Sequence, residues 1–424
     1  MTVKDSVKKI VGAERISAMK GVVMHYLCSM RLLPKGKLQL HDKKIRLYKD
    51  LSSNGFHVFR GYYDLKYISQ DQKKLLAHRL PITAGVNRNT KIDIGFYDLE
   101  NSEFRKITES SAWCWQQGSR LRWHPLYPDQ IIYNDVDRNN NCYCTRIFDI
   151  HDGIEKGKID FPLYDIADDY SYGISINFSR LQRLRPGYGY NFLPDETEKN
   201  PIPSQDGVYY VDVQSDTAKL LYTLKELSEE IGVSDNSECY LNHISISPDN
   251  KHFIFFLISN VPNVKGWNAV LFVSDTFGNY KILERKDRVS HYCWIDGKKL
   301  MVTCHKDDNI EYYCIFDIET GEKEILNIHK LNKDGHPSPL TKDQFITDTY
   351  PGINSLQEVL VFSQNCERAK TVLSVYHDYR LRGEKRCDLH PSVENNGRYF
   401  SVDSTYKDGK RSILVFKIEE QFNG

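Results

Sequence analysis

The chain has 424 residues, is 40% apolar and 12% aromatic, and carries a formal net charge of zero. This composition is typical of a β-rich globular protein, argues against disorder, and gives no sign that nucleic acid is a partner. No apolar run reaches the roughly 18 residues that a transmembrane helix needs. The ten cysteines follow no regular disulfide framework, so we expect reduced thiols in a cytoplasmic protein.

The N-terminal part, residues 1–36, differs in pattern from the rest. Apolar residues from Val3 to Met30 recur at a spacing of three and four, and most charged residues between them are Lys or Arg. The pattern predicts an amphipathic helix, with contact to a membrane surface through residues 3–31 as one interpretation. A helix packed on the protein's own surface is the alternative. The interrupted apolar run argues against a secretory signal.

From residue 40 to residue 420, short alternating strands and turn residues replace the helical pattern. Seven units of about 50 residues can be counted, which is the period of a propeller blade. The sequence therefore predicts an all-β fold, a seven-bladed β-propeller, with a string of small β domains as the competing architecture. A spare strand at 44–48 precedes the first unit. We expect it to pair with the last unit and close the ring.

Histidines mark the starts of the last four units, at His243, His291, His336 and His390. Equivalent positions of successive blades surround one central axis, so the four side chains are predicted to converge on one funnel. Clustered imidazoles suit a metal site or a proton-transfer site. The alternative is that histidine is simply tolerated at a blade entrance.

Other predicted blade entrances are rich in Arg, Tyr, Trp and Gln. Arginine pairs bidentately with carboxylates and aromatic rings stack on sugar faces, so these residues indicate a pocket for an acidic oligosaccharide or polysaccharide. Each of them could instead belong to a structural turn, the core or a solvated loop. The candidate substrate-binding residues are Arg60, Tyr63, Gln117, Arg120, Arg180, Arg183 and Tyr190.

A divalent metal ion is the expected cofactor. Cys239, Cys293 and Cys387 lie close in sequence to the entrance histidines, so a zinc site that mixes His and Cys is possible. An all-histidine site completed by a carboxamide or water would suit manganese better. The sequence leaves both open.

Short motifs accompany the four histidines. They are Asn242-His243 before Ser247-Pro248-Asp249, Ser290-His291-Tyr292-Cys293-Trp294, Asp334-Gly335-His336-Pro337-Ser338, and His390-Pro391-Ser392 before Asn396-Gly397-Arg398-Tyr399. With these motifs the chain resembles the seven-bladed propeller polysaccharide lyases, above all the oligogalacturonate lyases, and is similar in architecture to the ulvan lyases. The resemblance implies that His243 is the catalytic base and that His291, His336 and His390 bind the metal. The glutamine ligand of the family has no clear counterpart, and Cys387-Asp388-Leu389-His390 stands in its place.

The activity that this resemblance implies is β-elimination at a uronic acid. His243 would remove the C5 proton while Arg185 or the metal neutralises the sugar carboxylate. Tyr188 or Tyr190 would protonate the leaving oxygen. His124 is the alternative base.

Two other functional classes remain open on the sequence. One is a non-catalytic propeller, or a membrane-peripheral protein of envelope polysaccharide assembly, which would not need clustered histidines. The other is a hydrolase, for which Asp64 and Asp334 are the candidate carboxylates, although no acid–nucleophile pair stands out.

Overall fold

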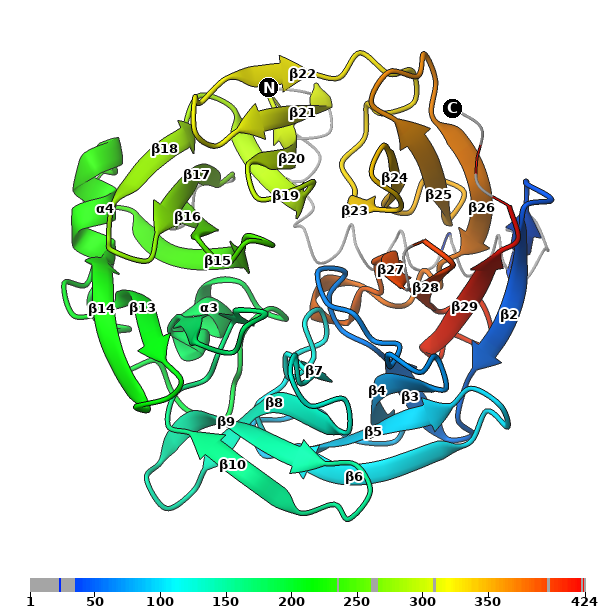
Figure 1. Ribbon diagram of the computed structural model, residues 1–424, viewed down its shortest axis with the longest axis horizontal. Helices are drawn as coiled ribbons and strands as arrows, with labels where there is room; N and C mark the ends of the chain where they lie inside the picture. Colours follow the sequence, from blue (N-terminus) through cyan, green and yellow to red (C-terminus); the bar gives the residue numbers. More distant parts are fainter. Residues whose placement is uncertain are drawn as a thin grey trace.

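Seven antiparallel sheets surround a central axis in a computed structural model of the chain (Figure 1). The structure describes residue 23 and residues 35–234, 236–260, 266–307, 310–394, 397–420 and 422. The predicted seven-bladed β-propeller is therefore confirmed. The predicted helix over 1–36 and its membrane contact fall almost entirely outside the described residues. In the part that is described, no helix is long and apolar enough to cross a membrane.

The first three blades are four-stranded sheets, and in each sheet the strands follow one another in chain order from the axis outward. Blade one consists of β3 (Phe56–Phe59), β4 (Lys74–Pro81), β5 (Ile92–Asp98) and β6 (Phe104–Ser110). Blade two consists of β7 (Arg122–Trp123), β8 (Gln130–Asp137), β9 (Cys142–Asp149) and β10 (Glu155–Ile159). Blade three consists of β11 (Asp165–Ile166), β12 (Tyr172–Ser175), β13 (Gly207–Asp212) and β14 (Thr217–Thr223).

Blades four and five are also built from consecutive strands, and blades six and seven borrow a strand from the N-terminal side of the chain. Blade four consists of β15 (Glu238–Ile246), β16 (His252–Asn260), β17 (Asn268–Asp275) and β18 (Tyr280–Glu284). Blade five consists of β19 (Arg288–Trp294), β20 (Lys299–His305), β21 (Glu311–Asp317) and β22 (Lys323–Ile325). Blade six contains β23 (Ser338–Pro339), β24 (Gln344–Asp348), β25 (Leu356–Ser363) and β26 (Lys370–Tyr376), and blade seven contains β27 (Ser392–Glu394), β28 (Tyr399–Ser404) and β29 (Ser412–Ile418).

The ring closes between the two ends of the propeller. Strand β2 (Ile45–Leu51) pairs antiparallel with β29 and becomes the outer strand of blade seven. This confirms the closure predicted for the strand at 44–48, and it covers an edge that would otherwise leave backbone groups unpaired. The short strand β1 (Leu38–Leu40) pairs with β26, so blade six has five strands. The sequence did not predict this fifth strand because three residues are too short for a visible alternation.

In the described part of the chain, two helices and one 3₁₀ turn interrupt the strands. Helix α3 (Phe178–Leu184) lies in the long insertion of blade three, and the side chain of Asn177 caps it by accepting from the backbone N–H of Arg180. Helix α4 (Leu224–Ile231) follows β14 and begins with a capping box between Thr223 and Glu226. The 3₁₀ turn η1 (Gly383–Lys385) precedes blade seven. The insertion matters most, because the segment directly after α3 places Tyr188 against His243.

The segment between β3 and β4 reaches from blade one into the centre of the ring (Figure 1). Asp64 accepts from both terminal nitrogens of Arg120 in blade two, at 3.1 and 3.0 Å. The Tyr63 hydroxyl donates to the backbone carbonyl of Tyr292 in blade five at 2.8 Å. This crossing segment, residues 60–68, therefore ties blades together through the channel.

Blade seven holds the same crossing segment. The Arg60 side chain donates to Asp403 at 3.1 Å and to the carbonyl of His390 at 2.7 Å. Glu394 accepts from the backbone N–H of Tyr67 at 2.6 Å. All these groups are buried, so the segment is fixed by polar contacts that water cannot replace.

Replacing Glu394 by Gln should change how stability depends on pH. Burial raises the pKa of Glu394 from its ordinary 4.5 to about 7, so between these values the folded state binds a proton that the unfolded state has lost. Stability is then lost as pH rises through that window, by up to about 3 kcal/mol. Urea unfolding should show Glu394→Gln close to wild type at pH 5 and more stable at pH 8. An equal difference at both pH values would contradict the assignment.

Candidate functional site

Four histidines from four consecutive blades meet at the funnel. His243 lies in β15 and His291 in β19, whereas His336 and His390 directly precede β23 and β27. The ring centroids of His243 and His291 are 5.6 Å apart, those of His291 and His336 4.1 Å, and those of His336 and His390 4.3 Å. The predicted convergence is therefore present.

Local backbone irregularities aim these side chains at the axis. The pairing register shifts in β15 between Asn242 and Ser245, and in β19 between Val289 and Tyr292. His243 has a φ of 54° and lies inside the first of these bulges. Bulges re-aim side chains and are common next to functional sites. An inner strand of regular alternation would have turned these rings differently.

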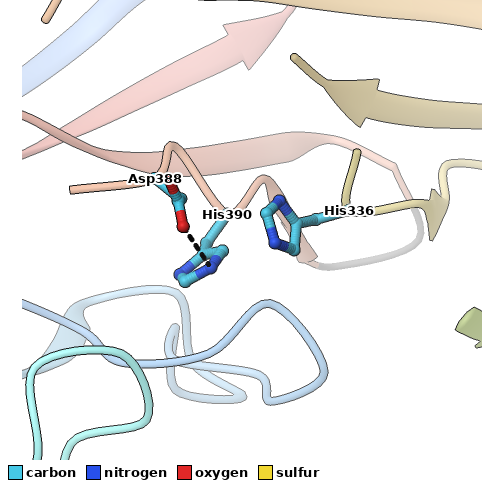
Figure 2. A group of neighbouring side chains, drawn as sticks. All are labelled: His336, Asp388 and His390. Atoms are coloured by element: carbon cyan, nitrogen blue, oxygen red, sulfur yellow. Dashed lines mark ion pairs between the residues drawn. The ribbon is translucent and has the colours of Figure 1, made fainter. Parts of the chain in front are cut away.

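His336 and His390 form a compact group with Asp388 (Figure 2). One ligand atom from each of the three residues lies within 4.8 Å of the other two. The Nε2 atoms of His336 and His390 are buried and have no hydrogen-bond partner. Buried imidazole nitrogens without a hydrogen-bond partner, beside a carboxylate, are a donor set that fits a divalent cation. Cysteine does not enter this group, so the mixed His and Cys site is not supported in the described part of the chain.

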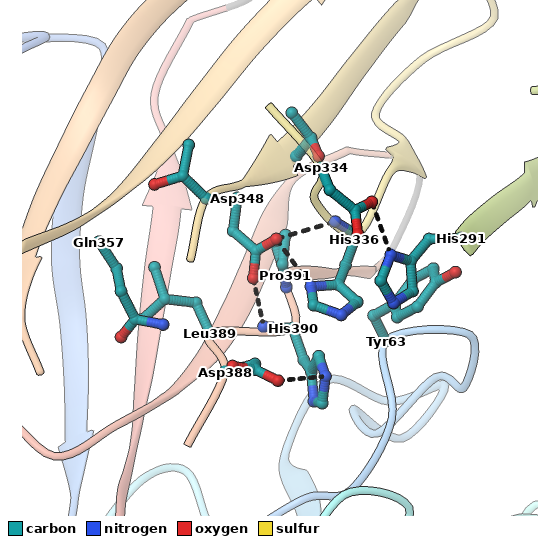
Figure 3. A network of polar contacts seen from close by, with 12 residues as sticks. Tyr63, His291, Asp334, His336, Asp348, Gln357, Asp388, Leu389, His390 and Pro391 are labelled. Carbon is teal, nitrogen blue, oxygen red and sulfur yellow. Dashed lines mark hydrogen bonds and ion pairs between the residues drawn. The ribbon is translucent and has the colours of Figure 1, made fainter. Parts of the chain in front are cut away.

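The histidine rings are held from behind by oxygen acceptors (Figure 3). His291 donates from Nδ1 to Asp334 at 2.9 Å, and His336 donates from Nδ1 to Asp348 at 2.8 Å. The other oxygen of Asp348 accepts the backbone N–H of His390 at 3.0 Å. Asp348 thus fixes both histidines of the compact group, as carboxylates commonly do behind metal-binding imidazoles.

The protonation tendencies of these rings differ. Burial, with the neighbouring His291 and Arg185 acting in the same direction, lowers the pKa of His243 well below its ordinary value. Burial also lowers the pKa of His390 well below its ordinary value. For His336 burial acts in the same direction, but Asp348 outweighs it and raises the pKa. His243 is therefore a neutral imidazole that can accept a proton.

Asp388 lies near the histidines and also forms an ion pair with Arg386. Arg386 donates to both of its carboxylate oxygens at 2.7 Å, and the Arg386 guanidinium lies 4.9 Å from the ring centroid of Tyr350. Although burial acts in the opposite direction, Arg386 keeps the pKa of Asp388 well below its ordinary value. Asp388 is therefore a buried carboxylate anion beside two nitrogens that lack a hydrogen-bond partner, and Nε2 of His390 lies 3.9 Å from one of its oxygens.

Arg185 and Tyr188 lie next to His243. The Arg185 guanidinium packs 5.2 Å from the ring centroid of Tyr188 and 5.3 Å from that of Trp267. The Tyr188 ring is edge-on to His243, with centroids 6.3 Å apart. No carboxylate among the described residues forms an ion pair with Arg185. The structure thus leaves one cation beside the neutral imidazole available to an anionic ligand.

Three predicted substrate-binding arginines are committed to structural contacts. Arg60 bonds to Asp403 and Arg120 to Asp64. Arg180 donates to the backbone carbonyl of Cys239, and its guanidinium is buried among further carbonyls. Each of the three arginines is therefore a buried structural residue, which was the alternative to substrate binding. A guanidinium that satisfies buried acceptors cannot turn to a ligand without leaving them unpaired.

The remaining predicted residues divide between the funnel and the blades. Tyr63 lies 5.1 Å from His336 between ring centroids, although its hydroxyl is bonded to Tyr292. Gln117 donates to Tyr164 and Asn242 beside the bulge of β15. The carboxylates of Asp195 and Glu238 pair with Arg183.

Tyr190 and His124 do not contact the four histidines. Tyr190 is a fully buried core residue that stacks on Phe178, with ring centroids 4.3 Å apart. His124 packs against Tyr127 and Tyr170, and its Nδ1 accepts backbone N–H groups. Neither geometry supports the acid or base role suggested by the sequence.

Sequence reasoning missed several residues of the funnel. They are Tyr62, Asp348, Tyr350, Arg386 and the carboxylate of Asp388. A usable pattern existed for the last of these, because Asp-x-His occurs at both 334–336 and 388–390, and alternate residues of an extended segment share a face. For Tyr62 and Asp348 the contacts join segments that are distant in sequence, whereas Arg386 pairs with Asp388 only two residues away.

Known proteins resemble this chain in structure and not in sequence. No family model matches the chain, and no curated protein matches it. An oligogalacturonate lyase in complex with manganese superposes with a TM-score of 0.62 at 15% identity, covering 91% of this chain and 98% of that one. The chain has the fold of the oligogalacturonate lyases.

Two further structures agree with this fold. The oligogalacturonate lyase from Vibrio parahaemolyticus also gives a TM-score of 0.62 at 15% identity, over 92% of this chain and all of that one. The tricorn protease gives 0.51 at 10% identity, covering 87% of this chain and 35% of that chain. The resemblance to the oligogalacturonate lyases is thus confirmed for the fold, whereas the similarity to ulvan lyases stays a prediction.

Proposed function

We propose that the protein is a polysaccharide lyase that cleaves acidic, uronate-containing oligosaccharides by β-elimination in the funnel. The observation that carries the proposal is the convergence of His243, a neutral buried imidazole, with three further histidines and with Arg185, which pairs with no carboxylate among the described residues. The fold that the chain shares with oligogalacturonate lyases supports the same activity. The site thus combines a base with a carboxylate-binding group.

The residues have distinct tasks in this reaction. Arg185 pairs with the sugar carboxylate and offsets the negative charge that develops when the neighbouring C5 proton leaves. His243 removes that proton as the general base. Tyr188 packs against both residues and donates a proton to the leaving oxygen. Substrate charge is therefore neutralised next to the atom that loses the proton.

A divalent cation would be held by His291, His336 and His390, with Asp388 as an additional oxygen donor. The unpartnered Nε2 atoms of His336 and His390 fit this assignment. When bound, the cation supplies positive charge that stabilises the anion formed during elimination. Manganese is the ion we favour, because the structurally similar lyase was solved in complex with manganese.

The carboxylates of the site favour a lyase over a hydrolase. Asp334 and Asp348 accept from histidines, Asp388 is paired with Arg386, and Asp64 is paired with Arg120. A hydrolase needs one carboxylic acid and one free carboxylate across the scissile bond. Each of these four groups is already occupied by a cationic or imidazole partner.

Metal binding by the site is open to a direct test. Titration of the full chain with manganese chloride, followed by calorimetry, should show one bound ion, and His336→Ala should abolish binding because a ligand nitrogen is lost. Asp348→Asn should weaken it about 10- to 100-fold, since the supporting acceptor is altered. His151→Ala is the matched control, because His151 is an exposed histidine paired with Asp129. Unchanged binding in both site variants would contradict the assignment.

A separate prediction concerns activity. The unsaturated uronate product of an elimination absorbs ultraviolet light, so absorbance should grow when the protein meets oligogalacturonates with manganese. His243→Ala should lower the rate by on the order of 10²–10⁴-fold. Arg185→Lys should also lower it strongly, because an ammonium cannot reproduce a bidentate grip on a carboxylate.

Arg183→Lys is the control for the arginine variant. Arg183 lies in α3, two residues before Arg185, but it pairs with Asp195 and Glu238, so its replacement should leave the rate close to wild type. Equal losses in the Arg183 and Arg185 variants would contradict the role of Arg185. Failure to produce absorbance from any uronate-containing glycan would contradict the lyase and favour a non-catalytic propeller.

A further inference from the structure

A small cavity lies beside the funnel, between blade one and the segment that precedes blade seven. Most of its wall is apolar and comes from the end of β4 and the loop that follows it. The lining residues are His57, Leu80, Pro81, Ile82, Ala84, Val86, Trp115, Leu381, Lys385 and Arg411. Three of them are basic and none is acidic. The cavity therefore combines an apolar wall with an excess of positive charge.

The charge of Arg411 is buried without a carboxylate partner. Its guanidinium donates to the backbone carbonyls of Trp115, Lys385 and Arg386, at 2.9, 3.3 and 2.7 Å, and packs 4.7 Å from the ring centroid of Trp115. Arg411 is only 3% exposed, and no carboxylate among the described residues forms an ion pair with it. A buried cation that is held by neutral acceptors alone favours an anion nearby.

His57 adds a neutral hydrogen-bond donor. Its Nδ1 accepts from the backbone N–H of Arg411 at 3.2 Å. Because a backbone N–H can only donate, the neutral ring holds its proton on Nε2. Burial, together with the positive charges of Arg411, Lys385 and Lys410, lowers the pKa of His57 to about 4. Near neutral pH the ring therefore offers Nε2–H, which has no acceptor among the described residues.

The cavity adjoins the funnel on the side of blade seven. Lys385 ends η1, is exposed, and forms no ion pair with a described carboxylate. The next residue is Arg386, whose guanidinium donates to Asp388 at 2.7 Å, and Asp388 lies 3.9 Å from Nε2 of His390. A cation that lines the cavity is thus adjacent in sequence to a residue that contacts the group proposed to bind the metal.

The cavity also adjoins the funnel on the side of the α3 insertion. Trp115 is followed by Gln116, whose backbone N–H donates to the carbonyl of Gly187 at 3.1 Å. Gly187 directly precedes Tyr188, whose ring lies edge-on to His243. Segments that line the cavity are therefore in contact with segments that border the funnel.

We propose that this cavity is an accessory subsite that binds the carboxylate of a further uronate unit in the oligosaccharide occupying the funnel. The proposal rests on the proposed lyase function for the identity of that oligosaccharide. Lys385 pairs with the carboxylate and His57 donates to it, while the apolar wall and the Trp115 ring pack against the C–H groups of the sugar. The protein would then prefer acidic oligosaccharides that extend beyond the unit held in the funnel.

Affinity as a function of chain length tests the proposal. Calorimetry with oligogalacturonates of one to four units is best done on the full chain carrying His243→Ala, because loss of the base prevents cleavage during the measurement. Affinity should rise about 5-fold at the unit that reaches the cavity, as expected of one partly exposed ion pair. Lys385→Met keeps the apolar stem and removes the ammonium. It should remove most of this gain and leave the affinity for shorter oligomers unchanged.

Lys410→Met is the matched control. Lys410 is close enough to act on the pKa of His57, yet it does not line the cavity, so its replacement should preserve the dependence on chain length. Equal losses in the Lys385 and Lys410 variants would overturn the proposal, because general attraction to a positive surface would then account for the binding. Affinity that is independent of length before either replacement would overturn it as well.

The ring of His57 gives a second readout that does not depend on catalysis. In ¹H–¹⁵N NMR titrations of the same protein, with the His57 signals identified by their loss in His57→Gln, the longer oligomer should raise the pKa of His57, because a carboxylate beside the ring favours its charged form. Acetate at the same carboxylate concentration should leave this pKa unchanged. An equal effect of acetate, or no effect of the oligomer, would overturn the subsite.

These readouts separate the subsite from the proposed function. If the wild-type chain releases no unsaturated product but the length dependence and the change at His57 are observed, the subsite stands and the lyase function fails. If product forms and Lys385→Met does not alter the length dependence, the lyase function stands and the subsite fails.

Discussion

The buried ion pair between Asp64 and Arg120 is the constraint on which the centre of the molecule depends. It anchors the segment that leaves blade one and crosses the axis, and the Tyr292 hydroxyl adds a third contact to the same carboxylate at 3.2 Å. Removing one member of a buried pair typically costs about 3–5 kcal/mol, because the other charge remains uncompensated. The blades surround the site, and the crossing segment, residues 60–68, lies at its centre.

The crossing segment does more than fill the channel. The carbonyl of Gly61 holds the ring of His390, and the hydroxyl of Tyr62 meets the ring of His243. Residues from blade one therefore orient side chains that blades four and seven provide. Since a propeller blade contacts mainly its neighbours, such a crossing is what couples opposite sides of the funnel.

The acceptor behind each ring separates the four histidines into two kinds. In three rings a carboxylate or carbonyl accepts a hydrogen bond from Nδ1. This contact leaves Nε2 as the nitrogen that can bind a metal ion. His243 has a phenol instead and is buried next to Arg185, which disfavours its charged form. Histidine can thus serve as a metal ligand or as a base, depending on the group that contacts its Nδ1 atom.

The sequence by itself determined the seven-blade period, the strand that closes the ring and the meeting of four histidines, because these follow from spacing along the chain. The tertiary structure alone decided which polar residues are available for function. Arg60, Arg120 and Arg180 look like Arg185 in sequence, yet buried acceptors from other blades occupy the first three. The partners Asp348 and Tyr62 were equally hidden, because their contacts with the histidines cross between segments. Local sequence patterns indicate which face of a strand a residue lies on. Only the closed ring of blades brings its hydrogen-bond or ion-pair partner close enough to bind.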